Sequence, residues 1–409
     1  MLRLLRIPRS IQGFFQPVHE LFHKPQWRHF RFLVVALAVA WERHNWTSVW
    51  RLVEGGPWRQ KVNEFMTRAP WDGSKALMEL ALSTLKRLRP RPGQTLYIPV
   101  DASYLAKRAK KMAGLGYFKD PSTGGWIFGH EFVALGFWFR DVFLPAALSM
   151  YWPKKNVPRG CAFRTKNQCV AAMIENLQVP KGLKVVVLFD AYFLNPTVLA
   201  AIRKRGWSWV SVAGANRNVF LAHGQKSKIR TYRRTCWRKG FRSITVRAFG
   251  RQKRYWVTGA RSVRLSKVGP VRVVFSKAKR NQTPLALVSP RGTERRLVEH
   301  YAQRWAIEQY FKETKQLLGL GHYQTRSPAG VERHLQLVSC AHLLLTHVRL
   351  HQARREKAKT NRRTIARVSL SAAQAQLRYL VLCDIQKIAM QKARSPRALE
   401  RFMNLLRAA

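Results

Sequence analysis

Short, nearly continuous apolar segments alternate with amphipathic segments through the middle of the chain. Residues 95–101 and residues 184–190 are each almost wholly apolar and each finish on an aspartate. Such short runs, rich in β-branched and aromatic residues, predict buried strands. Residues 195–204 have a helical pattern, and residues 207–212 then predict another strand. Buried strands that alternate with helices indicate an α/β sheet covered by helices on both faces.

Two more strands, at residues 132–139 and 142–149, are predicted to form a meander with residues 95–101. A helix is predicted at residues 164–177. From residue 216 to 290 the pattern changes to short apolar segments separated by basic turns, which predicts a β-rich insertion. Its expected strands are at residues 243–246, 254–258, 271–275 and 285–288.

The two ends of the chain have helical patterns. Residues 1–90 predict short helices at 30–41, 46–52 and 75–88, with a turn at 55–58. Their aromatic anchors and basic faces favour a helical DNA-binding domain, and a bundle that only packs on the next domain is the alternative. After residue 350, helices are expected at 371–390 and at the end of the chain, following a basic exposed arm at 354–367.

These patterns divide the chain into three regions. The sequence Pro90-Arg91-Pro92-Gly93 is typical of a boundary. We therefore expect a helical domain at residues 1–90 and a catalytic domain at 91–350 that contains the insertion. A basic helical region at 351–409, which follows a predicted helix at 330–350, completes the chain.

One predicted helix, at residues 293–318, carries an unusual set of polar side chains. A threonine suited to N-capping precedes it and glycines follow it. At about 100° per residue, Tyr301, Arg304, Glu308 and Lys315 lie within an arc of roughly 60°. The alternative interpretation is an ordinary amphipathic helix with solvated charges.

The charge of the chain changes this interpretation. Lys and Arg number 75 against 20 Asp and Glu, which gives a net charge of +55. Nucleic acid is the natural partner of such a chain, because neutralised phosphates release counterions. A polybasic membrane-surface protein and a generic RNA-associated protein are the alternatives. The longest apolar run, residues 32–41, is too short to span a bilayer, and five scattered cysteines without CxxC spacing fit a cytoplasmic protein.

Acids are rare in this chain, so three of them stand out by context. Asp101 and Asp190 finish apolar strands, and Glu308 lies on the helix described above. Converging carboxylates in so basic a protein predict a site for Mg²⁺, which prefers oxygen ligands. Each acid alone could instead be a turn, cap or surface residue, and the neighbours His130 and Glu131 are a weaker pair of candidate ligands.

The spacing Tyr301-x2-Arg304-x3-Glu308-x6-Lys315 is similar, position for position, to the Tyr-Arg-Glu-Lys signature of bacterial insertion-sequence transposases. Together with Asp101 and Asp190, in this order, it resembles the catalytic triad of DDE transposases. The resemblance covers residues 95–350. It implies an α/β fold, an RNase H-like mixed sheet flanked by helices, with a β-rich insertion, a helical N-terminal domain and a helical C-terminal tail.

The resemblance also implies an activity. DDE transposases cleave DNA at the ends of the element with Mg²⁺ or Mn²⁺, and the released 3′-OH then attacks target DNA. Asp101, Asp190 and Glu308 would hold two metal ions, and Arg304 and Lys315 would contact phosphates of double-stranded DNA. Tyr301 would lie beside the terminal nucleotides.

Other implied features concern the complex with DNA. A homodimer across paired element ends is implied, in the bacterial cytoplasm at the nucleoid and without a membrane. A hairpin intermediate with a flipped base stacked on a tryptophan of the insertion is also implied. The candidates for that role are Trp207, Trp209, Trp237 and Trp256. Two alternatives stay open: an RNase H-like nuclease without strand transfer, and a non-catalytic nucleic-acid-binding descendant.

Overall fold

The structure is a computed structural model of the 409-residue chain. It describes residues 6–41, 44–52, 59–109, 111–120, 124–221, 225–238, 240–248, 251–360, 368–392, 395–397 and 400. The predicted turn at residues 55–58 lies outside these ranges, as does most of the helix predicted at the end of the chain.

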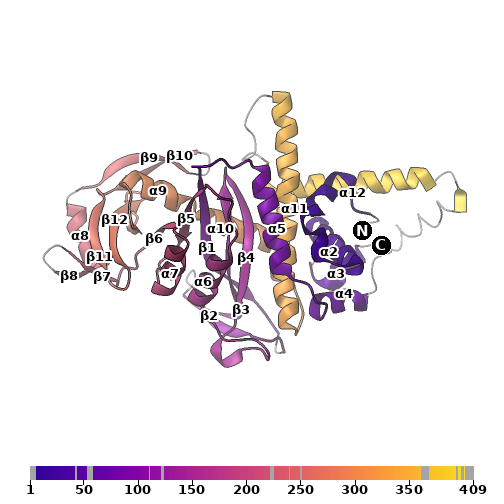
Figure 1. Ribbon diagram of the computed structural model, residues 1–409, viewed down its shortest axis with the longest axis horizontal. Helices are drawn as coiled ribbons and strands as arrows, with labels where there is room; N and C mark the ends of the chain where they lie inside the picture. Colours follow the sequence, from indigo (N-terminus) through magenta and orange to yellow (C-terminus); the bar gives the residue numbers. More distant parts are fainter. Residues whose placement is uncertain are drawn as a thin grey trace.

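A mixed sheet of 13 strands organises the fold (Figure 1). At its centre is β1 (Thr95–Ala106), which pairs antiparallel with β3 (Trp126–Phe139), and β3 pairs antiparallel with β4 (Val142–Tyr151). On the other side, β5 (Lys184–Phe189) and β6 (Ser208–Val212) run parallel to β1. The predicted meander and the strands predicted at residues 184–190 and 207–212 are thus confirmed.

The β-rich segment continues the same sheet beyond β6. The first added strand, β13 (Leu285–Ser289), pairs antiparallel with β6 and with β12 (Gly269–Lys277). All four strands predicted there are confirmed, but the sequence did not predict the helix α8 (Ile229–Arg238). The other strands of the sheet are β2 (Gly116–Lys119), β7 (Asn218–Phe220), β8 (Lys226–Lys228), β9 (Arg242–Ala248), β10 (Arg251–Val257) and β11 (Arg261–Leu265).

Helices cover both faces of the central strands. On one face, α6 (Lys166–Asn176) packs against β3 and β4, and α7 (Pro196–Lys204) packs against α6 and β6. On the opposite face, α9 (Glu294–Ala302) and α10 (Trp305–Leu317) pack against β5 and β1. The apolar side chains of both layers are buried, which stabilises the sheet between them.

The prediction of one continuous helix at residues 293–318 was wrong. Thr293 caps α9 as expected, but the helix ends at Ala302 and α10 begins at Trp305. Between them, the side chain of Gln303 accepts a hydrogen bond from Trp138 Nε1 at 2.8 Å and donates one to the Arg247 carbonyl at 3.4 Å. These contacts with two distant strands hold the break, and no glycine or proline marks it in the sequence.

The terminal helices gather around α11 (Pro328–Thr360), which stands beside the sheet (Figure 1). The helix α5 (Gly73–Arg87) packs against both α11 and β4, while α12 (Leu370–Lys392) packs on α11. Residues 354–360 of the predicted exposed arm continue α11 as helix, and residues 361–367 lie outside the described ranges. The other N-terminal elements are α1 (Arg9–Phe15), the 3₁₀ turn η1 (Gln16–Leu21), α2 (Lys24–Val39), α3 (Trp46–Arg51) and α4 (Arg59–Thr67).

The domain boundaries at residues 90 and 350 remain predictions. Across the first of them, the N-terminal helices and the sheet share one buried apolar cluster. None of the helices in the described ranges combines the length and the hydropathy that crossing a membrane requires.

Candidate active site

Asp101 lies on β1, and Asp190 directly follows the neighbouring parallel strand β5. In the β1–β5 pairing, Thr95 lies beside Lys184 and Pro99 beside Leu188, an offset of 89 residues in each case. The same offset separates the two aspartates (190 − 101 = 89). Side chains paired in this way point to the same face of a sheet. Asp101 contacts Arg304 on the face that α9 and α10 cover, and the Asp190 carboxylate lies close enough to raise the pKa of Asp101.

Asp101 does not end its strand, contrary to the sequence prediction. The strand β1 continues to Ala106 because β3 pairs with it as far as that residue. On its other side, β5 stops at Phe189, so nothing of β5 pairs with β1 beyond Pro99. Asp101 therefore lies where one side of the strand loses its partner, which leaves room for its carboxylate at the edge of the parallel pair.

Asp190 directly follows β5, as predicted. Its Oδ1 accepts hydrogen bonds from the backbone amides of Tyr192 at 3.0 Å and Phe193 at 3.4 Å. This carboxylate thus caps the turn after the strand, which is the structural role that a strand-terminal aspartate commonly has. Neither hydrogen bond involves Oδ2.

Arg304 joins Asp101 to Glu308. Its Nη1 donates a hydrogen bond to Asp101 Oδ2 at 2.6 Å, and its Nη2 donates to Glu308 Oε1. The exposed fractions of the Arg304, Asp101 and Glu308 side chains are 15%, 18% and 28%. The first turn of α10 thus brings one cation and one carboxylate against the edge of β1, held there by the buried Ile307 and Phe311.

Electrostatic interactions link all three acids. Burial raises the pKa of Asp101 to about 6, against the opposing effect of Arg304, and the Asp190 and Glu308 carboxylates raise it further. Burial lowers the pKa of Arg304, but Tyr301 and the three acids outweigh it and raise that pKa overall. The guanidinium therefore stays protonated and neutralises part of the negative charge that the acids concentrate here.

The other two signature residues occupy different places. Tyr301 lies at the end of α9 with the Arg304 guanidinium 5.6 Å from its ring centroid, and burial raises its pKa to about 12. Lys315 is exposed and lies two helical turns beyond Glu308, about 10 Å along α10. Tyr301, Arg304 and Glu308 are thus brought together with both aspartates, whereas Lys315 extends the site along the helix.

The donor chemistry of this site fits a hard divalent cation. Asp101, Asp190 and Glu308 offer only carboxylate oxygens, which Mg²⁺ and Mn²⁺ prefer. In the ranges that the structure describes, however, no three His, Cys, Asp or Glu side chains group closely enough to hold a metal ion. The guanidinium of Arg304 stands between two of the three acids.

The weaker candidate pair on β3 does not form a site. His130 contacts the Tyr323 hydroxyl at 2.6 Å and the Ala113 carbonyl at 2.8 Å. Glu131, the next residue of the strand, accepts instead from Lys166 Nζ at 2.6 Å. Since neighbouring residues of a strand point to opposite faces, these two side chains serve different parts of the core.

The four tryptophans considered for base stacking differ in accessibility. Trp209 is buried, Trp207 and Trp256 are half-buried, and Trp237 on α8 is 49% exposed. Figure 1 places α8 at the far end of the sheet from the N-terminal helices, with β5 and β6 between α8 and β1. The stacking role therefore stays a prediction, with Trp237 the most accessible ring.

The fold indicates a class of protein. The mixed sheet flanked by helices, with further helices at both ends of the chain, is an α/β fold of the RNase H-like transposase type. Residues 160–344 match the family model described as the transposase DDE domain, and this match supports a DDE transposase. The matched range contains Asp190, Arg304 and Glu308 and begins after Asp101. No curated protein matched the chain.

Proposed function

We propose that this protein is a DNA transposase that cleaves the ends of an insertion sequence and transfers the released 3′-OH into target DNA. The observation that carries the proposal is the meeting of Asp101, Asp190 and Glu308 on one face of the sheet. Asp101 comes from β1, Asp190 directly follows the neighbouring parallel strand β5, and Glu308 comes from a helix more than 100 residues further along the chain.

Asp101, Asp190 and Glu308 would hold the divalent ions. Such ions, when bound, stabilise charge on a phosphodiester and activate the attacking oxygen. Arg304, once the carboxylates are neutralised, is free to donate charge-assisted hydrogen bonds to phosphate oxygens. Tyr301 would position the terminal nucleotides, since its hydroxyl is kept protonated by burial.

The surrounding chain supplies the DNA contacts. Lys315 is exposed two turns from Glu308, and so can reach a phosphate further along the same strand of DNA. The net charge of +55 supports contacts with double-stranded DNA of both the element ends and the target. The basic N-terminal helices are proposed to bind the element ends, and two copies of the chain to pair them.

Glu308→Gln tests the catalytic role with little change in shape. We expect it to leave binding of end DNA intact while abolishing strand cleavage in Mg²⁺. The substrate is a labelled duplex from the DNA that flanks the gene, incubated with a supercoiled target. Glu175→Gln, an exposed glutamate of α6 paired with Lys204 at 3.5 Å, is the matched control and should cleave normally.

The products discriminate between the candidate functions. Joined end–target products support the transposase. Cut but unjoined products would instead indicate a nuclease of the same fold. Cleavage that survives Glu308→Gln, or that persists in EDTA, would overturn the assignment of the three carboxylates.

A further inference from the structure

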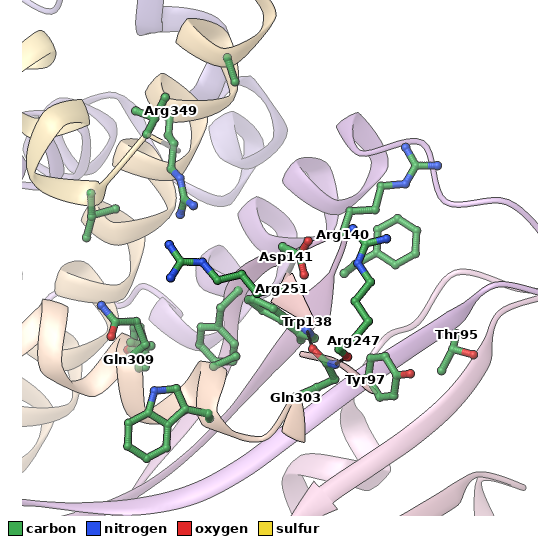
Figure 2. A pocket seen from close by; sticks show the side chains of 18 of the residues that line it. Thr95, Tyr97, Trp138, Arg140, Asp141, Arg247, Arg251, Gln303, Gln309 and Arg349 are labelled. Carbon is green, nitrogen blue, oxygen red and sulfur yellow. Dashed lines mark hydrogen bonds between the residues drawn. The ribbon is translucent and has the colours of Figure 1, made fainter. Parts of the chain in front are cut away.

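The three acids of the candidate site are not held in the same way. Two of them, one on β1 and one on α10, are joined by Arg304. The start of α10 is fixed in turn by the hydrogen bond between Gln303 and Trp138 (Figure 2). Asp190 has a different setting, because residues 190–195 belong to neither a helix nor a strand. The position of its carboxylate therefore depends on the side chains that hold this turn.

Most of this turn is anchored in the core. The Ser211 hydroxyl donates a hydrogen bond to the Asp190 carbonyl at 3.0 Å, and the Phe193 ring is buried. Tyr192 differs from both: its backbone amide donates to Asp190 Oδ1 at 3.0 Å, but its ring is 50% exposed. Burial therefore does not hold the side chain of the residue whose amide caps the carboxylate.

The Tyr192 ring is held by Lys166, the first residue of α6. The Lys166 ammonium nitrogen lies 4.2 Å from the centroid of this ring, within the range of a cation–π interaction. The ring of Tyr151, at the end of β4, lies 5.8 Å from the same nitrogen. The side chain of Lys166 is only 13% exposed, and cation–π interactions are stronger where the cation has lost water.

A buried carboxylate fixes Lys166 in turn. Glu131 Oε1 accepts a hydrogen bond from Lys166 Nζ at 2.6 Å, and the Glu131 side chain is 2% exposed. Burial raises the pKa of Glu131, while Lys166 and Tyr104 oppose this increase. Tyr104 lies opposite Glu131 in the β1–β3 register and three residues beyond Asp101, so it points to the other face of the strand. The ion pair thus lies beneath α6, on the face of the sheet away from α10.

The helix α6 does not itself need this lysine. It begins with a capping box between Thr165 and Gln168, which stabilises the first turn without the Lys166 side chain. A cation in the first turn is disfavoured by the positive end of the helix dipole. A buried ion pair also adds little stability, because the desolvation of both charges offsets their attraction. What the pair does fix is the place of one ammonium group beside the Tyr192 ring.

We infer that Lys166, held by Glu131, is a positioning residue for the carboxylate of Asp190. The contacts run from Glu131 to the Lys166 ammonium and from there to the Tyr192 ring. The Tyr192 amide then holds Asp190 Oδ1, which fixes the orientation of the carboxylate and so the direction in which Oδ2 is offered. The inference rests on the proposed function, because it takes Asp190 as a ligand of the divalent ion.

The test compares metal affinity with stability. Glu131→Gln and Lys166→Met together remove both charges and nearly keep the side-chain volumes, so no unpaired charge is left in the core. The double variant should unfold at nearly the same urea concentration as the wild type. Its dissociation constant for Mn²⁺, measured on the full-length protein from the EPR signal of free Mn²⁺, should rise about 3–30-fold, the range of one cation–π interaction. Asp190→Asn identifies the part of the signal that belongs to this site, because it removes a ligand.

Substitutions of Tyr192 separate positioning from packing. Tyr192→Phe keeps the ring and the backbone amide, and it should bind Mn²⁺ within about twofold of the wild type. Tyr192→Leu keeps an apolar side chain but loses the ring, and it should weaken Mn²⁺ binding as much as the double variant does. The matched control is Glu175→Gln with Lys204→Met, which removes an exposed ion pair of 3.5 Å between α6 and α7. It should change neither Mn²⁺ affinity nor stability.

Each outcome of these measurements decides for or against the inference. A double variant that binds Mn²⁺ like the wild type would overturn it, as would equal losses for Tyr192→Phe and Tyr192→Leu. If the double variant does not fold, Tyr192→Leu still decides, because half of that ring is exposed and its removal leaves the core intact. Wild-type protein without Mn²⁺ binding that depends on Asp190 would overturn the metal site of the proposed function, and this inference with it. Failure of the inference alone leaves wild-type binding intact, so the two failures are distinguishable.

Discussion

Replacing Arg304 by alanine should destabilise the folded protein far more than removing an ordinary surface arginine. Arg304 donates to both Asp101 and Glu308, and the side chains of Arg304 and Asp101 are only 15% and 18% exposed. Removing one partner of a buried ion pair leaves an uncompensated charge and costs about 3–5 kcal/mol. Because these groups keep some contact with solvent, we expect a loss of about 2–4 kcal/mol.

The loss should depend on pH in a defined direction. The pKa of Asp101 is already raised to about 6, and Arg304 is the largest influence that opposes this increase. Without Arg304 the pKa of Asp101 rises further, because the charged carboxylate loses its partner. Above that pKa the buried charge destabilises the folded protein, and protonation of Asp101 at lower pH removes this destabilisation. The deficit of the variant should therefore be largest near pH 8 and smaller near pH 5.

The assay is urea unfolding in EDTA at both pH values, followed by tryptophan fluorescence. Arg295→Ala is the matched control, since Arg295 also pairs with a glutamate four residues on but is 59% exposed, with an N–O distance of 3.8 Å. That variant should lose less than about 0.5 kcal/mol. Adding Mg²⁺ should narrow the deficit of Arg304→Ala, because bound ions would replace the missing positive charge.

A second substitution separates charge from packing. In the Arg304→Ala background, Asp101→Asn removes the unpaired charge and should recover about 1–3 kcal/mol, a coupling typical of contacting groups. The reasoning would be refuted if Arg304→Ala were as stable as the wild type in EDTA at pH 8. It would also fail if the loss did not change between pH 8 and pH 5.

Three further predictions concern other parts of the fold. Asp141→Gly should raise the free energy of unfolding by about 1 kcal/mol, because glycine accepts the positive φ of the β3–β4 turn without strain. A urea titration would measure this increase, and a variant less stable than the wild type would contradict the prediction. Burial lowers the pKa of His130 to about 4. The contribution of His130 to stability is therefore complete above about pH 6.5 and is lost as the pH falls towards 4. His130→Gln can still form a hydrogen bond with the Tyr323 hydroxyl, and it should flatten that part of a plot of unfolding free energy against pH. Gly319→Ala should lower the free energy of unfolding by at least about 2 kcal/mol, because the φ of Gly319 is 58° and the new Cβ would lie 2.5 Å from His44 Cβ. Thermal unfolding would measure this loss, and an unchanged melting temperature would contradict the prediction.

The central sheet and the aspartates could be predicted because their signals are local. Buried strands of a parallel pair are nearly continuous in apolar residues, and an acid at the end of such a run is conspicuous. The sequence placed Asp190 directly after its strand, as the structure has it. It could not show that β1 continues past Asp101, because the partner that extends it is β3, a strand some 30 residues away.

The break between α9 and α10 could not be predicted, for a related reason. Nothing between Ala302 and Trp305 disfavours a helix; the break is held by hydrogen bonds of Gln303 with Trp138 and with the Arg247 carbonyl. These partners lie more than 50 residues away in the sequence. Periodicity reports the tendency of a segment, whereas this feature depends on tertiary contacts that override it.

The strands of the β-rich insertion are hydrogen-bonded into the same sheet as β1 and β5, and this continuity limits how far the two parts can move apart. From β1, the order of neighbouring strands is β5, β6, β13 and β12, so four strand spacings separate β1 from β12. At about 4.8 Å each, these fix a length of about 19 Å. Two rigid domains on a flexible linker could vary this length, but a continuous ladder of backbone hydrogen bonds cannot stretch. The sheet would therefore fix the distance between the inserted strands and Asp101. DNA that contacts both would have to place its backbone at that distance.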